Sequence, residues 1–251
     1  MVLSVTPVKI QYFCRAISDG TPNQGNYHMT YLLPIMAVLW SFCFVYITQP
    51  RAKNELRLLL AFSGAFLLAL TIFELFPSVY RDEDPKLIGI CIMSGILLQI
   101  FLEFFSKGAE HGHVHLKKEG AHFPWLLFMS LSVHAFLEGF PVNNHNSIIY
   151  GIIVHKIPIS VILSIFLIDS KLKMRWVALF MVIFSLMTPM GSLVASQVPM
   201  VREYNAYATA IVIGIFLHIS TVILFESSEG HRFNLRKLAV IALGVIIAYF
   251  I

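Results

Sequence analysis

Residues 147–169 read SIIYGIIVHKIPISVILSIFLID, and this stretch decides the fold class of the chain. It is almost entirely apolar and lacks the alternation of barrel strands, so it predicts a helix. A helix needs about 20 mostly apolar residues to cross the hydrocarbon core of a bilayer, and this stretch is long enough. Seven further stretches have the same character, at about 30–48, 58–80, 86–106, 124–142, 175–197, 206–226 and 236–251. The sequence therefore predicts an all-α integral membrane protein, a bundle of eight transmembrane helices.

The composition of the whole chain agrees with a membrane protein and excludes a soluble domain. Of 251 residues, 57% are hydrophobic and 13% are charged, and the mean hydropathy is +0.77. Soluble domains carry about 25% charged residues and avoid exposing large apolar patches. The three cysteines, Cys14, Cys43 and Cys91, predict neither a disulfide framework nor a cysteine-rich metal site.

Basic residues are unevenly shared between the loops, and this asymmetry predicts the orientation. Twelve of the 18 Lys and Arg residues lie in alternate loops, which the positive-inside rule places in the cytoplasm. Both termini are then extracytoplasmic. Because this topology explains the net charge of +4, we expect no nucleic-acid partner. The twelve residues are Arg51, Lys53, Arg57, Lys107, Lys117, Lys118, Lys171, Lys173, Arg175, Arg232, Arg236 and Lys237.

The chain divides into a short N-terminal segment and one transmembrane domain. Residues 1–29 hold an apolar run that is too short and interrupted for a secretory signal, so we treat them as a poorly specified segment. Residues 30–251 form the predicted domain, with a cytoplasmic loop at about 107–123. Alternating histidines in this loop predict a flexible, low-affinity metal-binding tract, with a plain solvated linker as the alternative. These histidines are His111, His113 and His115.

Ionisable side chains inside the predicted spans are few, and each is costly in a membrane and therefore a candidate functional residue. His134 and Glu138 are four residues apart in SLSVHAFLEGFPV, so they project from one face of one helix. His155 lies three residues before Pro158, which frees a backbone carbonyl and bends the next span. Two imidazoles and a carboxylate suit a borderline cation such as Zn²⁺. The alternative is an interhelical hydrogen bond of His134 and Glu138, with His155 packed alone.

Two motifs resemble those of a known family. HAFLEG, which starts at His134, resembles the HNxxDG motif in the fourth helix of ZIP (Zrt-, Irt-like) divalent-metal transporters. HKIPIS, which starts at His155, resembles their fifth-helix HExPHE-type motif, in the branch with His-Lys-x-Pro. The FELFP sequence that ends the second span and the Thr-Pro-x-Gly turn at Thr188 support the resemblance.

The resemblance implies a multi-pass transporter of the cell (plasma or inner) membrane, with eight spans and both termini outside. It implies that the chain is not an enzyme and has no catalytic residues. His134, Glu138 and His155 would bind the transported divalent metal, which moves toward the cytoplasm. Zn²⁺ is the expected substrate, with Fe²⁺, Mn²⁺ or Co²⁺ as alternatives because the ligand types do not separate them.

Several family positions are altered here, and together they imply the loss of a second metal site. Ala135 replaces an asparagine, and Lys156 replaces the acidic residue beside the fifth-helix histidine. Ile159 replaces the ligand one turn later, and Thr188 stands where some members have a glutamate. Lys156 would place a fixed positive charge near Glu138, where a second cation would sit. We therefore expect a mononuclear site.

Further polar residues are candidates for the ion path. Glu74 occupies the place of a second-helix histidine in many family members, as a fourth ligand or a snorkelling carboxylate. His218 would line the path or bond a neighbouring helix, and Glu226 would belong to an exit shell or a solvated helix end. For Gln99 and Glu103 we expect solvated or interhelical roles.

Other function classes remain open from the residues alone. The chain has no GxxxxGK[ST] loop for ATP-driven pumping and no HExxH protease motif. The same three ligands could hold a catalytic zinc with an open water position, in an intramembrane hydrolase with Glu74 as the one obvious acid or base. A non-transporting metal-binding or sensing relative is the third reading. Small residues such as Gly64, Gly89 and Gly95 permit close helix contact, within the bundle or in a homodimer.

Overall fold

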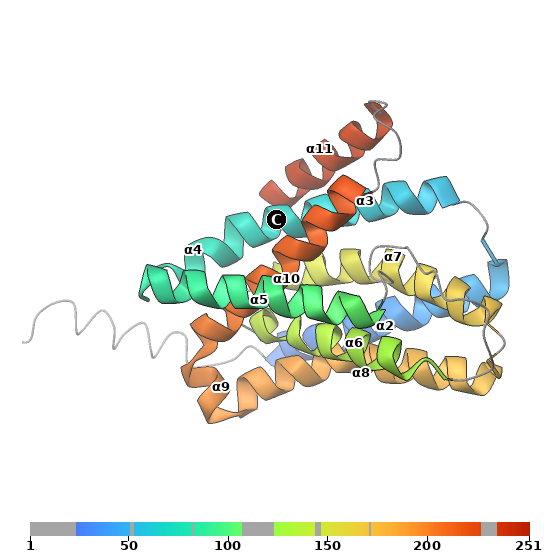
Figure 1. The fold of residues 1–251 in the computed structure, drawn as a ribbon, viewed down its shortest axis with the longest axis horizontal. Coiled ribbons are helices and arrows are strands. Elements are labelled where there is room, and N and C mark those ends of the chain that lie inside the picture. Colours follow the sequence, from blue (N-terminus) through green and yellow to red (C-terminus); the bar gives the residue numbers. More distant parts are fainter. Residues whose placement is uncertain are drawn as a thin grey trace, which may run out of the picture.

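The computed structural model describes residues 24–50, 53–81, 83–106, 123–143, 147–170, 172–226 and 235–251, and these ranges contain helices and no strand. Within these ranges the long helices follow one another along the chain, and short helices continue or link some of them (Figure 1). In chain order the elements are α2 (Gln24–Thr48), α3 (Lys53–Leu70), η1 (Thr71–Leu75), α4 (Phe76–Val79), α5 (Pro85–Ser106), α6 (Trp125–Leu137), η3 (Phe140–Asn143), α7 (Ile148–Asp169), α8 (Met174–Gln197), α9 (Pro199–Glu203), α10 (Asn205–Glu226) and α11 (Leu235–Tyr249).

Seven helical segments in the described part of the chain are long and apolar enough to cross a membrane. They coincide with the first seven predicted spans, although α2 begins at Gln24, ahead of the expected start near residue 30. α11 lies at the predicted eighth span but has 15 residues. At 1.5 Å per residue it is about 22 Å long, shorter than the hydrocarbon core of a typical bilayer. The histidine loop and residues 1–23 lie outside the described residues.

The start of α5 illustrates how local sequence places these helices. Pro85 is its first residue, where a missing N–H costs nothing. The carboxylate of Asp84 accepts hydrogen bonds from the backbone N–H groups of Lys86 and Leu87, at 2.8 and 3.0 Å. Those two donors have no partner inside the helix, so Asp84 fixes where α5 begins.

The long helices pack as two sets. We name α2, α6, α7 and α8 the site set, because they carry the predicted ligands, and α3, α5, α10 and α11 the companion set. Each set has a buried apolar cluster of its own, and α7 contributes side chains to both. The two sets meet where α3 packs on α7 and α5 packs on α6.

Glycines allow the closest helix contacts inside the companion set. A Cβ atom on Gly95 would lie 2.0 Å from the carbonyl oxygen of Ile211, and one on Gly214 would lie 2.0 Å from that of Ile92. α5 and α10 therefore touch backbone to backbone. Gly64 also faces α10, whereas a Cβ on Gly89 would meet nothing within 4 Å. The close contacts of Gly64 and Gly95 are thus made within the bundle.

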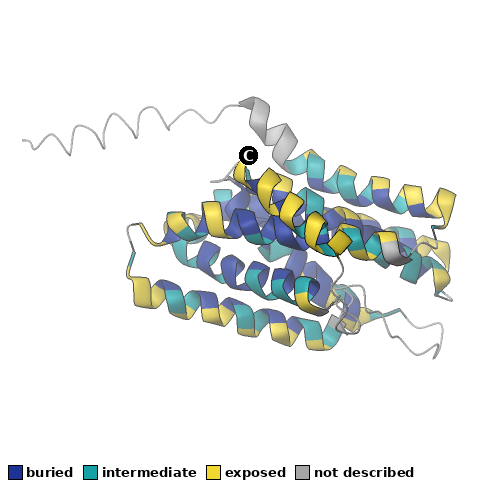
Figure 2. Ribbon diagram, turned by 90° about the horizontal axis from the view of Figure 1, so that it is seen from above, coloured by how far each residue is buried: buried dark blue, intermediate teal, exposed yellow. Residues whose placement is uncertain are grey.

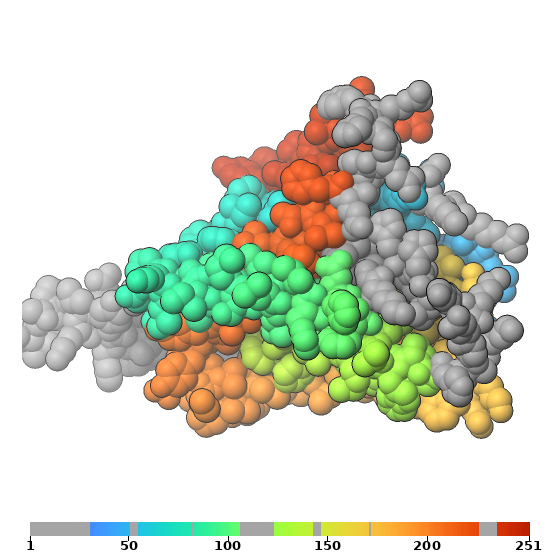
Figure 3. All heavy atoms as spheres, in the orientation of Figure 1, coloured from blue at the N-terminus to red at the C-terminus, as the bar shows by residue number. Residues whose placement is uncertain are grey.

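The outward faces of the helices are apolar, as expected of a chain surrounded by lipid. Burial increases from the periphery to the middle of the bundle (Figure 2). α5 carries a row of exposed large side chains that includes Ile90, Met93, Leu97 and Phe104. Figure 3 shows α5 and α10 side by side on one face, with α11 above them. This surface fits a hydrocarbon environment and would be unfavourable in water.

Candidate metal centre

The predicted ligands lie where α6, α7 and α8 meet. α6 ends at Leu137, and Glu138 caps it with its N–H donated to the carbonyl of His134 at 3.1 Å. This one helical turn holds the side chains of His134 and Glu138 on the same face. Both side chains are buried. The local helix therefore supplies an imidazole and a carboxylate together, as the spacing predicts.

A contact between two backbones brings α8 against this end of α6. A Cβ on Gly191 would lie 1.8 Å from the carbonyl oxygen of Phe136, and one on Gly139 would lie 2.2 Å from that of Thr188. No other residue type fits at either position without displacing a backbone. The two glycines therefore place Thr188 directly beside the carboxylate of Glu138.

The two oxygens of Glu138 have different surroundings. Its Oε1 lies 2.5 Å from the ammonium nitrogen of Lys156 and accepts a hydrogen bond from the Thr188 hydroxyl at 2.9 Å. Its Oε2 lies 3.3 Å from Nε2 of His134. The carboxylate is thus held on one side by a cation and a hydroxyl, while its other oxygen faces an imidazole.

α7 supplies His155 and Lys156, which are buried although they are consecutive in the chain. Neighbouring residues point in different directions from a helix, and both find protein around them because α7 contacts α2, α3 and α8. The ring of His155 lies 6.4 Å from that of His134, centroid to centroid, with 77° between the planes. α7 continues through Pro158, which leaves the carbonyl of Val154 without its helical donor.

Two groups stabilise the ammonium of Lys156 inside the bundle. Its ammonium pairs with Glu138 and lies 4.7 Å from the ring centroid of Phe184 on α8. An unpaired ammonium at this depth would cost several kcal/mol in a real protein interior. The pairing puts a positive charge directly beside the carboxylate of the predicted ligand Glu138.

The other altered positions are filled with apolar or neutral side chains. Ala135 and Ile159 are buried and belong to the two apolar clusters. Thr188 is buried to 1% exposure, and its hydroxyl also lies 2.8 Å from the carbonyl oxygen of Ala135.

The side chains of His134, Glu138 and His155 lie in one region of the bundle, but they do not form a closed ligand shell. Within the described ranges, no group of three or more His, Cys, Asp and Glu side chains is arranged to hold a metal ion. Glu138 turns one oxygen to Lys156 instead, and the two imidazole rings stand apart. To bind one ion together, these side chains would have to move closer to one another.

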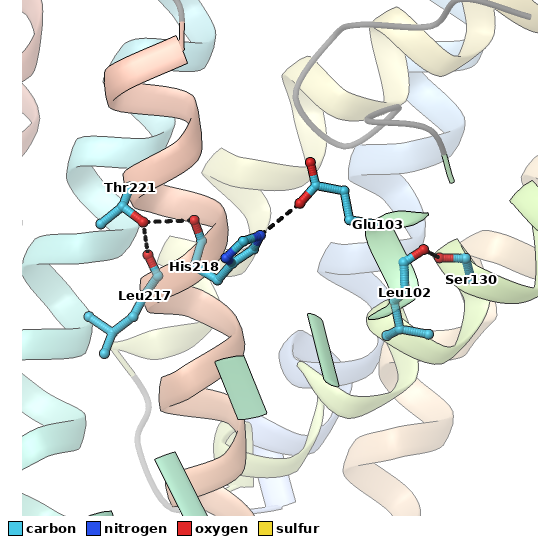
Figure 4. Close-up of polar contacts among 6 residues, drawn as sticks. All are labelled: Leu102, Glu103, Ser130, Leu217, His218 and Thr221. Carbon is cyan, nitrogen blue, oxygen red and sulfur yellow. Dashed lines mark hydrogen bonds and ion pairs between the residues drawn. The ribbon is translucent and has the colours of Figure 1, made fainter. Parts of the chain in front are cut away.

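The remaining predicted residues lie elsewhere. Glu74 is half-buried on the wide turn η1, which precedes Pro77. His218 on α10 pairs with Glu103 on α5, Nε2 to Oε2 at 2.7 Å, which gives both residues an interhelical role (Figure 4). Glu226 ends α10, and nothing is described of its side chain. His111, His113 and His115 fall outside the described residues.

Two polar contacts were not foreseen from the sequence. The hydroxyl of Ser130 on α6 donates to the carbonyl of Leu102 on α5 at 2.6 Å, across the boundary between the two sets (Figure 4). The hydroxyl of Tyr207 on α10 donates to Glu83 at 2.6 Å. The partners of each pair are far apart in the chain, so no local pattern could have linked them.

A groove of about 450 Å³ between α2, α3 and α7 contains none of the predicted ligands. Its walls are apolar and include Trp40, Phe44, Leu59 and Val161. In a bilayer such a surface faces acyl chains and not an ion. The centre itself is closed, because His134, Glu138, His155 and Lys156 are each at most 3% exposed.

Comparison with known proteins agrees with this arrangement. A family profile, ZIP Zinc transporter, matches residues 106–251, a range that includes every residue of the centre. Zinc transporter ZIP1 of Danio rerio is 33% identical over 88 residues, which cover 33% of this chain and 29% of that protein. Protein zntD of Dictyostelium discoideum is 30% identical over 156 residues, or 51% of this chain and 22% of that protein.

A second fish protein, Zinc transporter ZIP1 of Takifugu rubripes, is 32% identical over 88 residues, or 33% of this chain and 29% of that protein. The matched part of the chain spans less than a third of the length of these curated relatives. The family is one of transporters and not of enzymes, which removes the hydrolase alternative. Since the family profile matches more than half of the sequence, this chain belongs to the ZIP zinc transporter family.

Proposed function

We propose that this chain carries a divalent metal ion, foremost Zn²⁺, across the membrane toward the cytoplasm, with His134, Glu138 and His155 as its ligands. The observation that carries the proposal is the burial of two imidazoles and a carboxylate together on α6 and α7. Such groups are expensive inside a membrane and mark ion pathways. Nitrogen and oxygen ligands suit a borderline cation. Fe²⁺, Mn²⁺ and Co²⁺ are the competing substrates.

The site is mononuclear in this proposal. Lys156 pairs with Glu138 where the second cation of relatives with acidic residues would lie. Ile159 and Ala135 offer no donor atom, and the Thr188 hydroxyl is directed to Ala135 and Glu138. The consecutive His155 and Lys156, with Pro158, support membership in the branch with a His-Lys-x-Pro motif in the fifth helix. A water molecule or Glu74 would complete the shell of the ion.

Transport requires the two helix sets to move against each other. The centre is closed to both sides, so an ion can reach it only after a rearrangement. The site set carries the ligands and meets the companion set along α3–α7 and α5–α6, which makes these contacts the natural sliding surfaces. Rocking of one helix set against another is the general form of alternating access. Three protein ligands hold the ion weakly enough to release it.

The topology completes the proposal. α11 serves as the eighth span, both termini are extracytoplasmic, and the chain resides in the cell membrane. Residues 1–29 precede a single transmembrane domain, 30–251. Glu226 lies at the cytoplasmic end of α10 in this orientation. With the loop histidines His111, His113 and His115, it would receive the ion as it leaves.

The test is Zn²⁺ uptake into proteoliposomes that contain the purified protein. His134→Ala and His155→Ala should each lower the initial rate by at least about 100-fold, beyond the 10–100-fold loss typical of outer-shell partners of a metal. His218→Gln is the matched control, because His218 is a largely buried histidine on α10, outside the centre. Uptake by this variant should remain close to that of the wild type. Metal accumulation in intact cells reports the direction.

Two results would contradict the proposal. Uptake that survives both histidine substitutions would move the ligands elsewhere. A wild-type protein that binds Zn²⁺ stoichiometrically but transports no divalent metal would favour the sensing relative. Circular dichroism and gel filtration of each variant show whether a loss of uptake reflects a loss of folding.

A further inference from the structure

We propose that Thr188 is a positioning residue of the metal centre: with Lys156 it fixes Oε1 of Glu138, so that Oε2 alone is presented to the metal. This inference rests on the proposed function, because it assigns the way in which one proposed ligand binds. It predicts a carboxylate that coordinates through one oxygen, beside two imidazole nitrogens.

The argument starts from the unequal surroundings of the carboxylate. Oε1 has the Lys156 ammonium at 2.5 Å and the Thr188 hydroxyl at 2.9 Å, whereas Oε2 has Nε2 of His134 at 3.3 Å. Both partners of Oε1 come from helices other than α6. The carboxylate is therefore held from two directions, and rotation about its last bond would break two contacts together.

The hydroxyl of Thr188 has one proton and two acceptors within reach. One is Glu138, and the other is the carbonyl of Ala135 at 2.8 Å. That carbonyl lies in the last turn of α6, where Gly139 donates its N–H to Phe136 and not to Ala135. Thr188 can thus bond the helix end or the carboxylate, and it stays within reach of both.

A water molecule could not take the place of the Thr188 hydroxyl if that hydroxyl were removed. The backbone contacts at Gly139 and Gly191 hold this turn of α8 against α6, and the threonine side chain is 1% exposed. Loss of the hydroxyl would leave Oε1 with Lys156 as its anchor. Lys156 is a flexible side chain with a second attraction, the ring of Phe184 at 4.7 Å. The carboxylate would then turn more freely.

A fixed single oxygen affects which ions bind well. Zn²⁺ favours few ligands that include imidazole, whereas Mn²⁺ favours a shell richer in oxygen. A carboxylate free to turn both oxygens to the ion would serve Mn²⁺ comparatively better. Thr188 is therefore expected to set the affinity for Zn²⁺ and its advantage over Mn²⁺.

The experiment compares Thr188→Val with Thr188→Ser in the same proteoliposomes, with Zn²⁺ alone and with Mn²⁺ as competitor. Thr188→Val keeps the shape and removes the hydroxyl, and a hydrogen bond to a charged group is worth about a tenfold change in affinity. We expect the KM for Zn²⁺ to rise about tenfold, the maximal rate per folded protein to stay within about twofold, and the preference over Mn²⁺ to narrow. Thr188→Ser should restore all three values.

Thr209→Val is the matched control, because Thr209 is also buried to 1% but lies on α10, outside the centre. It should leave the KM unchanged. A Thr188→Val protein with wild-type KM would overturn the inference. So would a variant with lower thermal stability and an unchanged KM, since Thr188 would then only cap α6. If Thr188→Val does not fold, Thr188→Ala provides the same comparison in a smaller side chain.

The two proposals fail in different ways. Uptake that survives His134→Ala overturns the ligand assignment, whatever Thr188 does. If uptake is lost in His134→Ala, but Thr188→Val and the wild type have the same KM for Zn²⁺, then the positioning role alone is overturned. Equilibrium Zn²⁺ binding to the detergent-solubilised wild type and Thr188→Val proteins provides the affinity ratio independently of transport.

Discussion

Two carboxylate–imidazole pairs in this molecule have different environments. His134 and Glu138 are one turn apart on α6, at 3.3 Å, with side chains 3% and 1% exposed. Glu103 and His218 join α5 to α10 at 2.7 Å, with 26% and 15% exposed. The buried pair has a lysine that neutralises its carboxylate. A buried carboxylate depends more on such a cation than a partly exposed one does, and the longer distance belongs to the pair that we propose as metal ligands.

The largest effect should follow from removing that third partner. Lys156→Met leaves Glu138 buried without its cation, and breaking a buried ion pair costs about 3–5 kcal/mol. We expect a correspondingly lower free energy of unfolding, measured by denaturant titration in detergent. The double variant Lys156→Met/Glu138→Gln should recover most of the loss, because no buried charge remains. Equal stability of wild type and Lys156→Met would show that the ammonium does not neutralise Glu138.

The pH dependence of uptake should show which of the two carboxylate–imidazole pairs binds the ion. An imidazole must be neutral to bind a metal. Lowering the pH adds protons that compete with the ion for the imidazole nitrogens, so uptake should fall by roughly tenfold between pH 7.5 and 5.5. His218→Gln should keep the same profile. A flat profile in the wild type would argue against imidazole ligands.

The smallest effect should come from the partly exposed pair of Glu103 and His218. Glu103→Gln removes the charge and keeps a hydrogen-bonding side chain next to His218. Exposed ion pairs contribute about 0–1 kcal/mol, so the free energy of unfolding should change within that range, and Zn²⁺ uptake should stay within about twofold. A loss of uptake comparable to that of His134→Ala would instead make Glu103 part of the ion path.

The pattern of the sequence was sufficient for the features that depend on local geometry. Apolar length predicted the first seven spans, because the bilayer sets how long a helix must be. The spacing of His134 and Glu138 predicted their shared face, because one helical turn fixes it. The approach of Lys156 to Glu138 followed from the family motifs on α6 and α7.

The features that the sequence did not reveal depend on contacts between distant segments. Thr188 reaches Glu138 only because two glycines let the backbones of α6 and α8 touch. Glu103 and His218 are 115 residues apart in the chain, and each was assigned a role without its partner. The eighth span was predicted from composition, yet α11 is a shorter helix than a simple crossing needs. The ligand roles of His134, Glu138 and His155 stay a prediction.

The contact of Gly139 and Gly191 has a thermodynamic consequence for the proposed carrier. Because α6 and α8 touch backbone to backbone, the proposed ligands His134 and Glu138 and the threonine that orients Glu138 would travel as one piece. A metal centre that keeps its geometry has the same intrinsic affinity for the ion at either face of the membrane. Such a carrier cannot by itself accumulate an ion above equilibrium. The gradient of free ion and the membrane potential would then set the direction of net flux, and a reversed gradient would run the cycle backwards.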